Sequence, residues 1–186
     1  MRRRFGWANA VTVLRIGLVP LFAWLLLAPQ NPASAVNWGA FVVFAVAAWT
    51  DTLDGYLARR QGMITPLGQF LDPLADKLLV GVALLGLVLI RDFPLWAALV
   101  IIGREFAISI LRTAGLRRGR SMPATIHGKI KTALQVPMVL IWLMPRRGTM
   151  LTVQDVVMWL AVAFTVISGA QYLMRARGLL DRSQPS

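Results

Sequence analysis

Residues 51–76 read DTLDGYLARRQGMITPLGQFLDPLAD, and they carry four of the eight acidic residues of the chain: Asp51, Asp54, Asp72 and Asp76. Apolar runs flank the stretch, with FVVFAVAAW ending at Trp49 and LLVGVALLGLVLI beginning at Leu78. An ionised side chain at the centre of a bilayer costs at least about 2.5–3.5 kcal/mol on insertion scales. Four carboxylates in such a setting therefore need a partner of opposite charge.

The spacing of the four aspartates indicates what that partner is. Asp51 and Asp54 are three residues apart and Asp72 and Asp76 are four apart, so each pair shares one face of a helix. Two such helices side by side bring four hard oxygen ligands together. Carboxylates without cysteine or clustered histidine favour Mg, Mn or Ca over zinc. The stretch therefore predicts a divalent-metal site.

Small residues continue the acidic face of the first of these helices. Gly55 and Ala58 follow Asp51 at i+4 and i+7, and they leave room for a ligand to lie against the helix. Arg59 can meet a phosphate at the end of the helix. We therefore expect the metal site to hold a phosphorylated ligand. The alternative is a structural one, in which the carboxylates merely pair with Lys or Arg.

Composition places the chain in a membrane. Its 186 residues are 57% hydrophobic, which is too apolar for an ordinary soluble domain. The net charge of +12 could suggest nucleic-acid binding. A better explanation is that the basic residues of a membrane protein gather on its cytoplasmic side, so we expect no nucleic-acid partner. The absence of cysteine excludes disulfides and thiolate metal sites.

Six apolar segments are each near the ~20 residues that cross a bilayer. They lie at about 10–28, 37–58, 69–90, 94–113, 130–145 and 152–173. They predict an all-α, polytopic membrane protein with six transmembrane helices, in which a single membrane domain fills residues 1–186. The first segment is interpreted as a span and not as a cleavable signal peptide. Thr65-Pro66 is typical of an N-cap followed by a first-turn proline.

Basic residues predict the orientation in the cell membrane. With the N-terminus inside, the cytoplasmic side carries most of them: Arg2, Arg3, Arg4, Arg59, Arg60, Arg112, Arg117, Arg118, Arg120, Lys129, Lys131, Arg175, Arg177 and Arg182. The opposite side carries Arg91, Arg146 and Arg147. The positive-inside rule then places both termini and the aspartate site at the cytoplasm. Tryptophans near the ends of spans are expected to be interfacial anchors: Trp7, Trp38, Trp96 and Trp142.

The acidic stretch also resembles a known family. Its pattern is Asp51-x2-Asp54-Gly55-x2-Ala58-Arg59-x8-Gly68-x3-Asp72-x3-Asp76, and it matches the signature of the CDP-alcohol phosphotransferases residue for residue. The resemblance implies an integral membrane enzyme that moves a phosphoalcohol group from a CDP-linked donor to an acceptor alcohol and releases CMP. It also implies the family's six-helix membrane bundle, usually a homodimer.

Three further stretches resemble the phosphatidylglycerophosphate synthase branch of that family. They are TPLGQFLDPLADK (65–77), GREF (103–106) and GKIKT (128–132), and the resemblance covers roughly residues 9–140. The last apolar segment is only generically similar. The branch implies CDP-diacylglycerol and glycerol 3-phosphate as substrates, with membrane lipids around the protein.

The resemblance gives the site residues their roles. It implies two divalent ions, Mg or Mn, held by Asp51, Asp54, Asp72 and Asp76, with Asp76 also accepting the proton of the acceptor hydroxyl. The nucleotide is expected at Asp51, Gly55, Ala58, Arg59, Gly68, Asp72, Asn9 and Thr12. Asn9 and Thr12 begin the pattern Asn-x2-Thr-x2-Arg; the family commonly has a proline before it, where this chain has Ala8. Arg15, which ends the pattern, has a second interpretation as an interfacial anchor.

Four basic residues are expected to bind the phosphate of the acceptor: Arg104, Arg112, Lys129 and Lys131. A structural pair of Arg104 with Glu105 or with an aspartate is the alternative for the first of them. So many cations favour a phosphorylated acceptor over a neutral polyol, but they do not separate glycerol 3-phosphate from inositol phosphate. His127 is not expected to be catalytic. A divalent-cation carrier and a purely structural membrane subunit are the alternatives from other functional classes.

Overall fold

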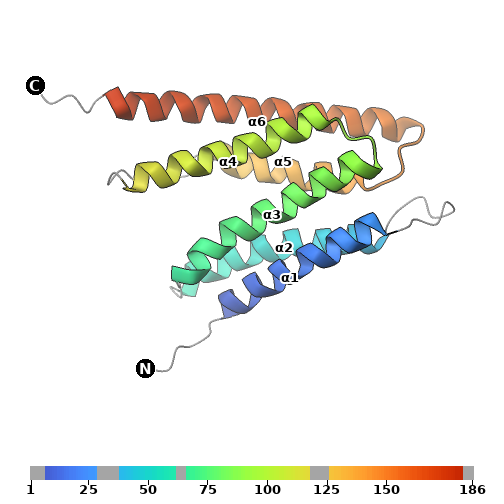
Figure 1. Cartoon of the computed structure of the whole chain (residues 1–186), viewed down its shortest axis with the longest axis horizontal. Helices are drawn as coiled ribbons and strands as arrows, with labels where there is room; N and C mark the ends of the chain where they lie inside the picture. The colour runs from blue at the N-terminus through green and yellow to red at the C-terminus, as the bar shows by residue number, and fades with distance from the viewer. Residues whose placement is uncertain (1–6, 29–37, 62–65, 118–125, 182–186) are drawn as a thin grey trace, which may run out of the picture. The chain divides into compact units, whose positions relative to one another are not determined.

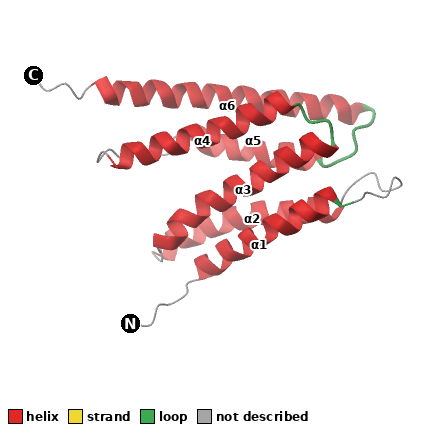
Figure 2. Ribbon diagram, in the orientation of Figure 1, coloured by secondary structure: helices red, strands yellow, loops and turns green. Residues whose placement is uncertain are grey.

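The computed structural model describes residues 7–28, 38–61, 66–117 and 126–181 (Figure 1). These ranges contain α-helices and no strand, which confirms the all-α prediction (Figure 2). The six helices are α1 (Trp7–Leu27), α2 (Trp38–Gln61), α3 (Pro66–Ile90), α4 (Leu95–Arg117), α5 (Ile126–Trp142) and α6 (Thr149–Asp181). The expected segment ends lie within about four residues of the helix ends, except that α6 continues well past residue 173 to Asp181.

Local chemistry explains several of these ends. Helix α3 begins at Pro66, where the missing N–H of proline costs no helical hydrogen bond. It ends at a turn in which Asp92 adopts a φ of 56°, a left-handed conformation that Asp tolerates better than most residues. The N–H of Phe93 donates back to the carbonyl oxygen of Leu87 at 3.3 Å. The same carbonyl accepts from the N–H of Arg91 at 2.9 Å, so two donors share one acceptor at the end of the helix.

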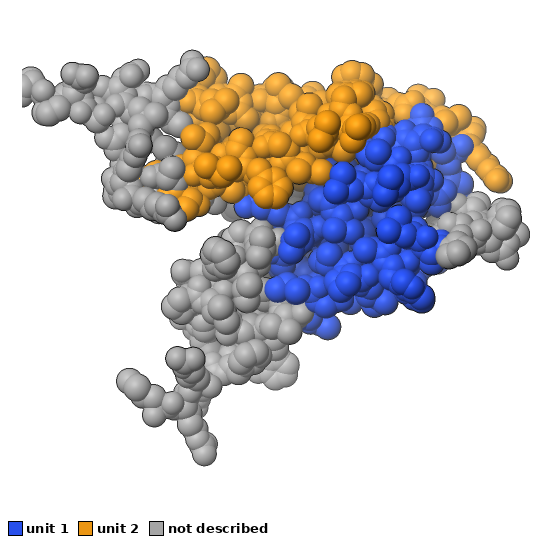
Figure 3. All heavy atoms as spheres, in the orientation of Figure 1, with its two compact units in different colours: residues 1–93, 139–146 blue, residues 94–138, 147–186 orange. Residues whose placement is uncertain are grey.

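The chain forms two compact units, shown in separate colours in Figure 3. Unit 1 comprises residues 1–93 and 139–146, and unit 2 comprises residues 94–138 and 147–186. Unit 1 therefore contains α1, α2 and α3, and unit 2 contains α4, α6 and most of α5. That residues 1–186 form a single domain stays a prediction.

In unit 1, α1 packs against both α2 and α3. The rings of Phe22 and Phe44 are fully buried, with centroids 5.4 Å apart. A Cβ atom at Gly86 would collide with the side chain of Leu26, so any larger residue at position 86 would force that buried side chain to shift. The other buried residues of these helices are apolar apart from Arg15 of α1, and they include Ala40, Ala47, Ala83, Leu84 and Leu87. The helices that carry the acidic stretch are thus joined to α1 through a tight apolar core.

A second cluster in unit 1 surrounds Trp142. This side chain is 1% exposed, and its ring lies edge-on to Phe93 with centroids 4.7 Å apart. The guanidinium carbon of Arg146 lies 4.8 Å from the centre of the same ring. The prediction of an interfacial anchor is therefore wrong for Trp142, because its ring is used for internal packing and a cation–π contact. Trp38 and Trp96, in contrast, are 61% and 44% exposed.

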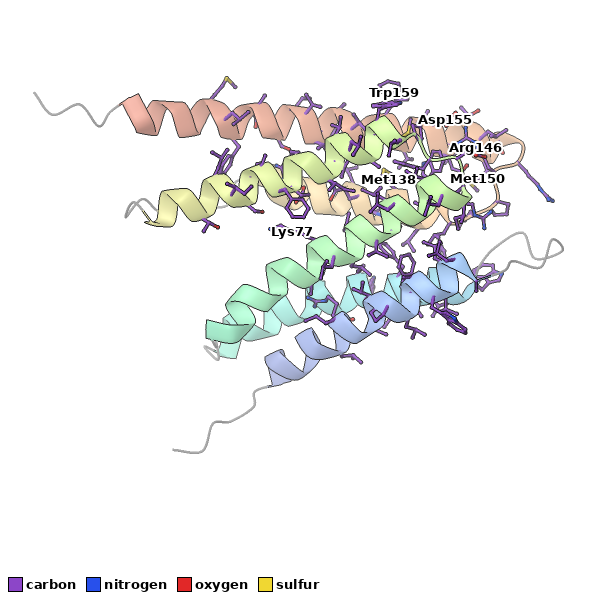
Figure 4. The ribbon with its side chains drawn as sticks, viewed as in Figure 1. Lys77, Met138, Arg146, Met150, Asp155 and Trp159 are labelled. Carbon is purple, nitrogen blue, oxygen red and sulfur yellow. The ribbon has the colours of Figure 1, made fainter. Side chains whose placement is uncertain are left out.

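In unit 2, α4 packs against α6. The rings of Trp96 and Trp159 meet with centroids 5.1 Å apart, and Figure 4 labels Trp159 on α6. The buried residues of α6 recur at helical spacing and form one stripe: Gln154, Met158, Ala161, Val162, Thr165, Ser168 and Tyr172. Several of these are polar, so this stripe differs in chemistry from the core of unit 1.

Within the described ranges, one helix segment is long and apolar enough to cross a membrane. It is Thr149–Met174, with 26 residues and a mean hydropathy of 1.9. Only 28% of its most apolar stretch is buried inside the protein. The shorter apolar segments are Leu14–Leu27, Trp38–Thr50 and Lys77–Ile90. Six complete spans stay a prediction. The many exposed large apolar side chains, such as Leu89, Ile110 and Trp159, are typical of a surface that lipid or another protein covers.

Candidate functional site

The four aspartates of the acidic stretch lie on two consecutive helices of unit 1. Asp51 and Asp54 belong to the C-terminal half of α2, and Asp72 and Asp76 to the N-terminal half of α3. At a rise of about 1.5 Å per residue, Asp51 lies about 15 Å before the end of α2 at Gln61, and Asp76 lies about 15 Å beyond the start of α3 at Pro66. Asp54 and Asp72 each lie about 10 Å from the same two helix ends. The backbone thus sets the acidic positions at two matching levels on neighbouring helices.

The positions expected to bind the nucleotide follow the same two helices. Gly55, Ala58 and Arg59 lie on α2, one to two turns beyond Asp51, and Gly68 lies in the first turn of α3. Helix α1, which packs on both α2 and α3, carries Asn9 and Thr12 in its first two turns. Unit 1 therefore contains every position that the sequence assigns to the metal and the nucleotide.

The side chains of these residues lie outside the described ones, so their metal and nucleotide roles stay predictions. Among the side chains that the structure does describe, no three His, Cys or acidic residues gather closely enough to hold a metal ion. Arg15 is described and is 2% exposed. Its burial favours a place inside the protein over the interfacial-anchor interpretation, because an anchor extends its charged end to water.

Arg104 of α4 makes two polar side-chain contacts in unit 2, one with Glu105 and one with Ser168. One guanidinium nitrogen, Nη1, lies 3.1 Å from Oε1 of Glu105, and both side chains are 14% exposed. The other, Nη2, donates to Oγ of Ser168 on α6 at 3.0 Å. The alternative expected for Arg104, a pair with Glu105, is therefore present. Its role in binding the acceptor phosphate stays a prediction.

The packing of Arg104 against α6 depends on a second glycine. A Cβ atom at Gly169 would lie 3.3 Å from Cγ of Arg104, so the stem of the arginine runs close over the glycine. The hydroxyl of Ser168 also donates to the carbonyl oxygen of Thr165 at 3.1 Å, which fixes its orientation. Arg104 thus connects α4 to α6 by one hydrogen bond and by close packing.

The other predicted acceptor residues lie on either side of residues 118–125. Arg112 is five residues before the end of α4, and Lys129 and Lys131 are in the first two turns of α5. Their side chains lie outside the described ones. On α4, Ser109 donates to the carbonyl oxygen of Glu105 at 2.7 Å, and Thr113 donates to that of Ser109 at 2.9 Å. Glu105, Ser109 and Thr113 therefore mark a polar face that leads along α4 towards Arg112.

Ser168 and Gly169 are absent from the residues that the sequence singled out. The last apolar segment is only generically similar to the family, but polar residues recur along it at helical spacing: Gln154, Thr165, Ser168 and Tyr172. In an otherwise apolar helix, such a stripe indicates a face that packs against protein rather than lipid. The stripe shows which face of α6 packs against protein, but it does not show that Arg104 is the residue that contacts this face.

Comparison with known proteins gives concordant matches. The family model of the CDP-alcohol phosphatidyltransferases matches residues 5–167. A probable phosphatidylglycerophosphate synthase of Mycobacterium tuberculosis is 41% identical over 169 residues, covering 91% of this chain and 80% of the relative. The CDP-diacylglycerol–glycerol-3-phosphate 3-phosphatidyltransferases of Bacillus subtilis and Escherichia coli are 38% and 36% identical. These matches cover 92% and 96% of this chain and 95% and 100% of the two relatives.

Proposed function

The chain belongs to the CDP-alcohol phosphatidyltransferase family, and we propose that it transfers the phosphatidyl group of CDP-diacylglycerol to glycerol 3-phosphate. The products are phosphatidylglycerophosphate and CMP. The observation that carries the proposal is the acidic stretch, whose four aspartates occupy matching levels on two neighbouring helices. The names of the relatives favour glycerol 3-phosphate as the acceptor.

Asp51, Asp54, Asp72 and Asp76 would hold the divalent ions, Mg or Mn, that the family uses. Their chemistry fits, because four carboxylates without thiolate or imidazole suit hard cations. When bound, two such ions would neutralise the diphosphate of the donor and stabilise the departing CMP. Gly55, Ala58 and Gly68 leave space for the nucleotide, with Asn9 and Thr12 at its edge, while Arg59 contacts phosphate.

Asp76 accepts a proton in the proposed reaction. As it does so, the oxygen of the acceptor hydroxyl attacks the phosphorus that bears the diacylglycerol. The bond from that phosphorus to the oxygen of CMP breaks, and CMP leaves with the electron pair. The chain has no cysteine and a single histidine, so no obvious nucleophile is available for a covalent enzyme intermediate. Direct displacement is the simplest scheme.

Arg112, Lys129 and Lys131, with Arg104 as the sequence predicts, bind the phosphate of the acceptor. Binding energy from this remote phosphate positions the hydroxyl for attack. We further propose six transmembrane spans in the cell membrane, with both termini and the active site facing the cytoplasm, where the water-soluble acceptor is available. A homodimer is part of the same proposal. The family match over residues 5–167 includes parts of both units, which supports a single domain.

A product assay tests the proposed function. Purified protein in detergent receives CDP-diacylglycerol, Mg and labelled glycerol 3-phosphate, with inositol 1-phosphate in a parallel reaction and Asp51→Asn as the inactive control. Release of CMP with glycerol 3-phosphate alone is expected. Turnover only with inositol phosphate would keep the chemistry and overturn the acceptor. If neither reaction releases CMP, the transferase function is rejected and a divalent-cation carrier becomes the favoured interpretation.

A further inference from the structure

Helix α5 buries a glutamine within an apolar run. Gln135 is 3% exposed, although residues 133–142 around it read ALQVPMVLIW and contain no other amide, hydroxyl or charged side chain. Within the described part of the chain, its Nε2 atom has no hydrogen-bond partner. A buried N–H without a partner costs stability, and in native proteins it is usually explained by a ligand, a water molecule or a function. The amide of Gln135 therefore favours a partner from outside the chain.

The buried face of α5 leads from Gln135 to a residue that is expected to bind the acceptor. Met138, labelled on α5 in Figure 4, and Trp142 follow Gln135 at i+3 and i+7 and are 0% and 1% exposed. These three positions form one buried stripe. In the other direction, Lys131 precedes Gln135 by four residues, and positions i and i+4 share a helix face. Lys131 and Gln135 therefore occupy one face of α5, about 6 Å apart along its axis.

Unit 2 contains Gln135 together with the four residues that are expected to bind the acceptor phosphate. One of them, Arg104, also has a buried nitrogen, Nε, for which the described residues provide no hydrogen-bond partner. Helices α4 and α5 therefore each carry a buried N–H donor that the described protein does not use. Such donors suit a ligand that is rich in oxygen atoms, and a phosphorylated polyol is one.

We propose that Gln135 donates a hydrogen bond from Nε2 to the C2 hydroxyl of glycerol 3-phosphate and so recognises the glycerol part of the acceptor. The inference rests on the proposed function, and it separates recognition of the alcohol from binding of the phosphate. With the phosphate at Lys131, the three-carbon chain of the acceptor spans on the order of one helical turn, which leads to the level of Gln135.

The chemistry of the amide fits the C2 hydroxyl better than the other groups of the acceptor. The C1 hydroxyl is the one that attacks, and its proton goes to Asp76 in the proposed reaction. The phosphate is better served by cations, because charge-assisted hydrogen bonds are the strong ones. The C2 hydroxyl still needs a partner, and a neutral amide both donates and accepts, as a hydroxyl does.

Two acceptors that differ only in this hydroxyl test the proposal: glycerol 3-phosphate and 3-hydroxypropyl phosphate, which lacks it. Values of kcat/KM for both are measured in wild type and in Gln135→Met, because methionine has the length of glutamine but no N–H donor. Wild type should prefer glycerol 3-phosphate. Gln135→Met should lower kcat/KM for glycerol 3-phosphate by roughly tenfold and leave that for 3-hydroxypropyl phosphate within about twofold. The variant should thus lose most of the preference between the two acceptors.

Gln154 provides a matched control, because it is a second buried glutamine of unit 2 and is 0% exposed. It lies in the second turn of α6, fourteen residues or about 21 Å before Ser168, which contacts Arg104. Gln154→Met should therefore keep the wild-type preference between the two acceptors. Gln135→Leu is measured in parallel and should lose the same preference as Gln135→Met, so that the result does not depend on one replacement.

An equal loss of kcat/KM for the two acceptors in the Gln135 variants would overturn the proposal, since a structural role or a buried water molecule would produce that result. Failure of both variants to fold, judged by thermal unfolding in detergent, would also overturn it, because the structure itself would then need the amide. An inactive wild type would reject the proposed function. An active wild type without the preference, or variants that retain it in full, would reject only the role of Gln135.

Discussion

Two glycines in this protein allow close helix packing, and the side chains that lie against them are opposite in chemistry. In unit 1, Leu26 of α1 occupies the space that a side chain at Gly86 of α3 would need. In unit 2, the stem of Arg104 of α4 runs over Gly169 of α6, and its guanidinium reaches Ser168 and Glu105. The first contact is wholly apolar, whereas the second buries most of a charged group.

The difference indicates what each contact is for. Apolar packing between helices stabilises a membrane protein without a charge that must be compensated. A charge inside a membrane is costly and is usually kept for a function, or is balanced by a partner. Arg104 has such a partner in Glu105, and it fixes the register of α4 against α6. We therefore interpret the contact in unit 1 as one that contributes to stability alone, and the contact in unit 2 as one that contributes to stability and also positions α6.

Replacement of Arg104 should have the largest effect on stability. Arg104→Ala removes the guanidinium from beside Glu105 in a site where both side chains are 14% exposed. Breaking a buried pair in this way costs about 3–5 kcal/mol, less if Glu105 takes up a proton. The melting temperature in detergent should fall sharply, with a smaller fall for Arg104→Lys. Unchanged stability with a raised Michaelis constant for glycerol 3-phosphate would instead assign Arg104 to the acceptor site alone.

Gly86→Ala should destabilise the protein by about 1–3 kcal/mol, because the new methyl group collides with the buried side chain of Leu26. Gly81→Ala is the matched control on the same helix, since a Cβ atom there meets nothing within 4 Å. The control should be neutral or slightly stabilising, because alanine favours a helix over glycine. Thermal unfolding of both variants provides the measurement, and equal behaviour would refute the tight packing of α1 on α3.

Ser168→Ala should have a smaller effect. It removes the acceptor of the hydrogen bond from Arg104, and interhelical hydrogen bonds in membranes contribute about 0.6 kcal/mol on average and up to about 1.7. Ser109→Ala is a suitable comparison, because the Ser109 hydroxyl donates within its own helix. A double-mutant cycle of Ser168→Ala with Arg104→Lys measures the coupling between α4 and α6. A coupling energy of zero would contradict the contact.

Gly169→Ala should have the smallest effect. The methyl group would lie 3.3 Å from Cγ of Arg104, so the arginine must shift only by a few tenths of an ångström. The gain in helix propensity offsets part of that strain, and the net change should stay below about 1 kcal/mol. Gly103→Ala is the control with open space around it. A loss of stability as large as that caused by Gly86→Ala would mean that the two glycine contacts are equally rigid.

Much of the fold could be predicted from the sequence, because it depends on local patterns. The apolar segments give the helices, and Thr65-Pro66 gives the start of α3 at Pro66. The acidic stretch predicts the site by itself, since the spacing of Asp51, Asp54, Asp72 and Asp76 defines helix faces without any tertiary information. The family match is in accord with that prediction.

The remainder depends on contacts between residues far apart in the chain. Trp142 ends a helix, as an interfacial anchor would, but Phe93 and Arg146 enclose its ring. The sequence offered two interpretations of Arg104 and favoured phosphate binding, because nothing local indicates that Ser168 is in reach. The extension of α6 to Asp181 was missed because its last residues are too polar for a span. Hydropathy marks the part of a helix that can cross a membrane, whereas the helix itself can continue through polar residues.

The central claim, that the acidic stretch performs a metal-assisted phosphatidyl transfer in which Asp76 is the base, is tested most directly by comparing Asp76→Asn with Asp51→Asn. Turnover and binding of CDP-diacylglycerol are measured for both in the presence of Mg. Asp76→Asn should lower turnover by at least roughly a hundredfold while leaving donor binding largely intact, whereas Asp51→Asn should also weaken donor binding. Equal loss of donor binding in the two variants, or substantial turnover by Asp76→Asn, would contradict the account.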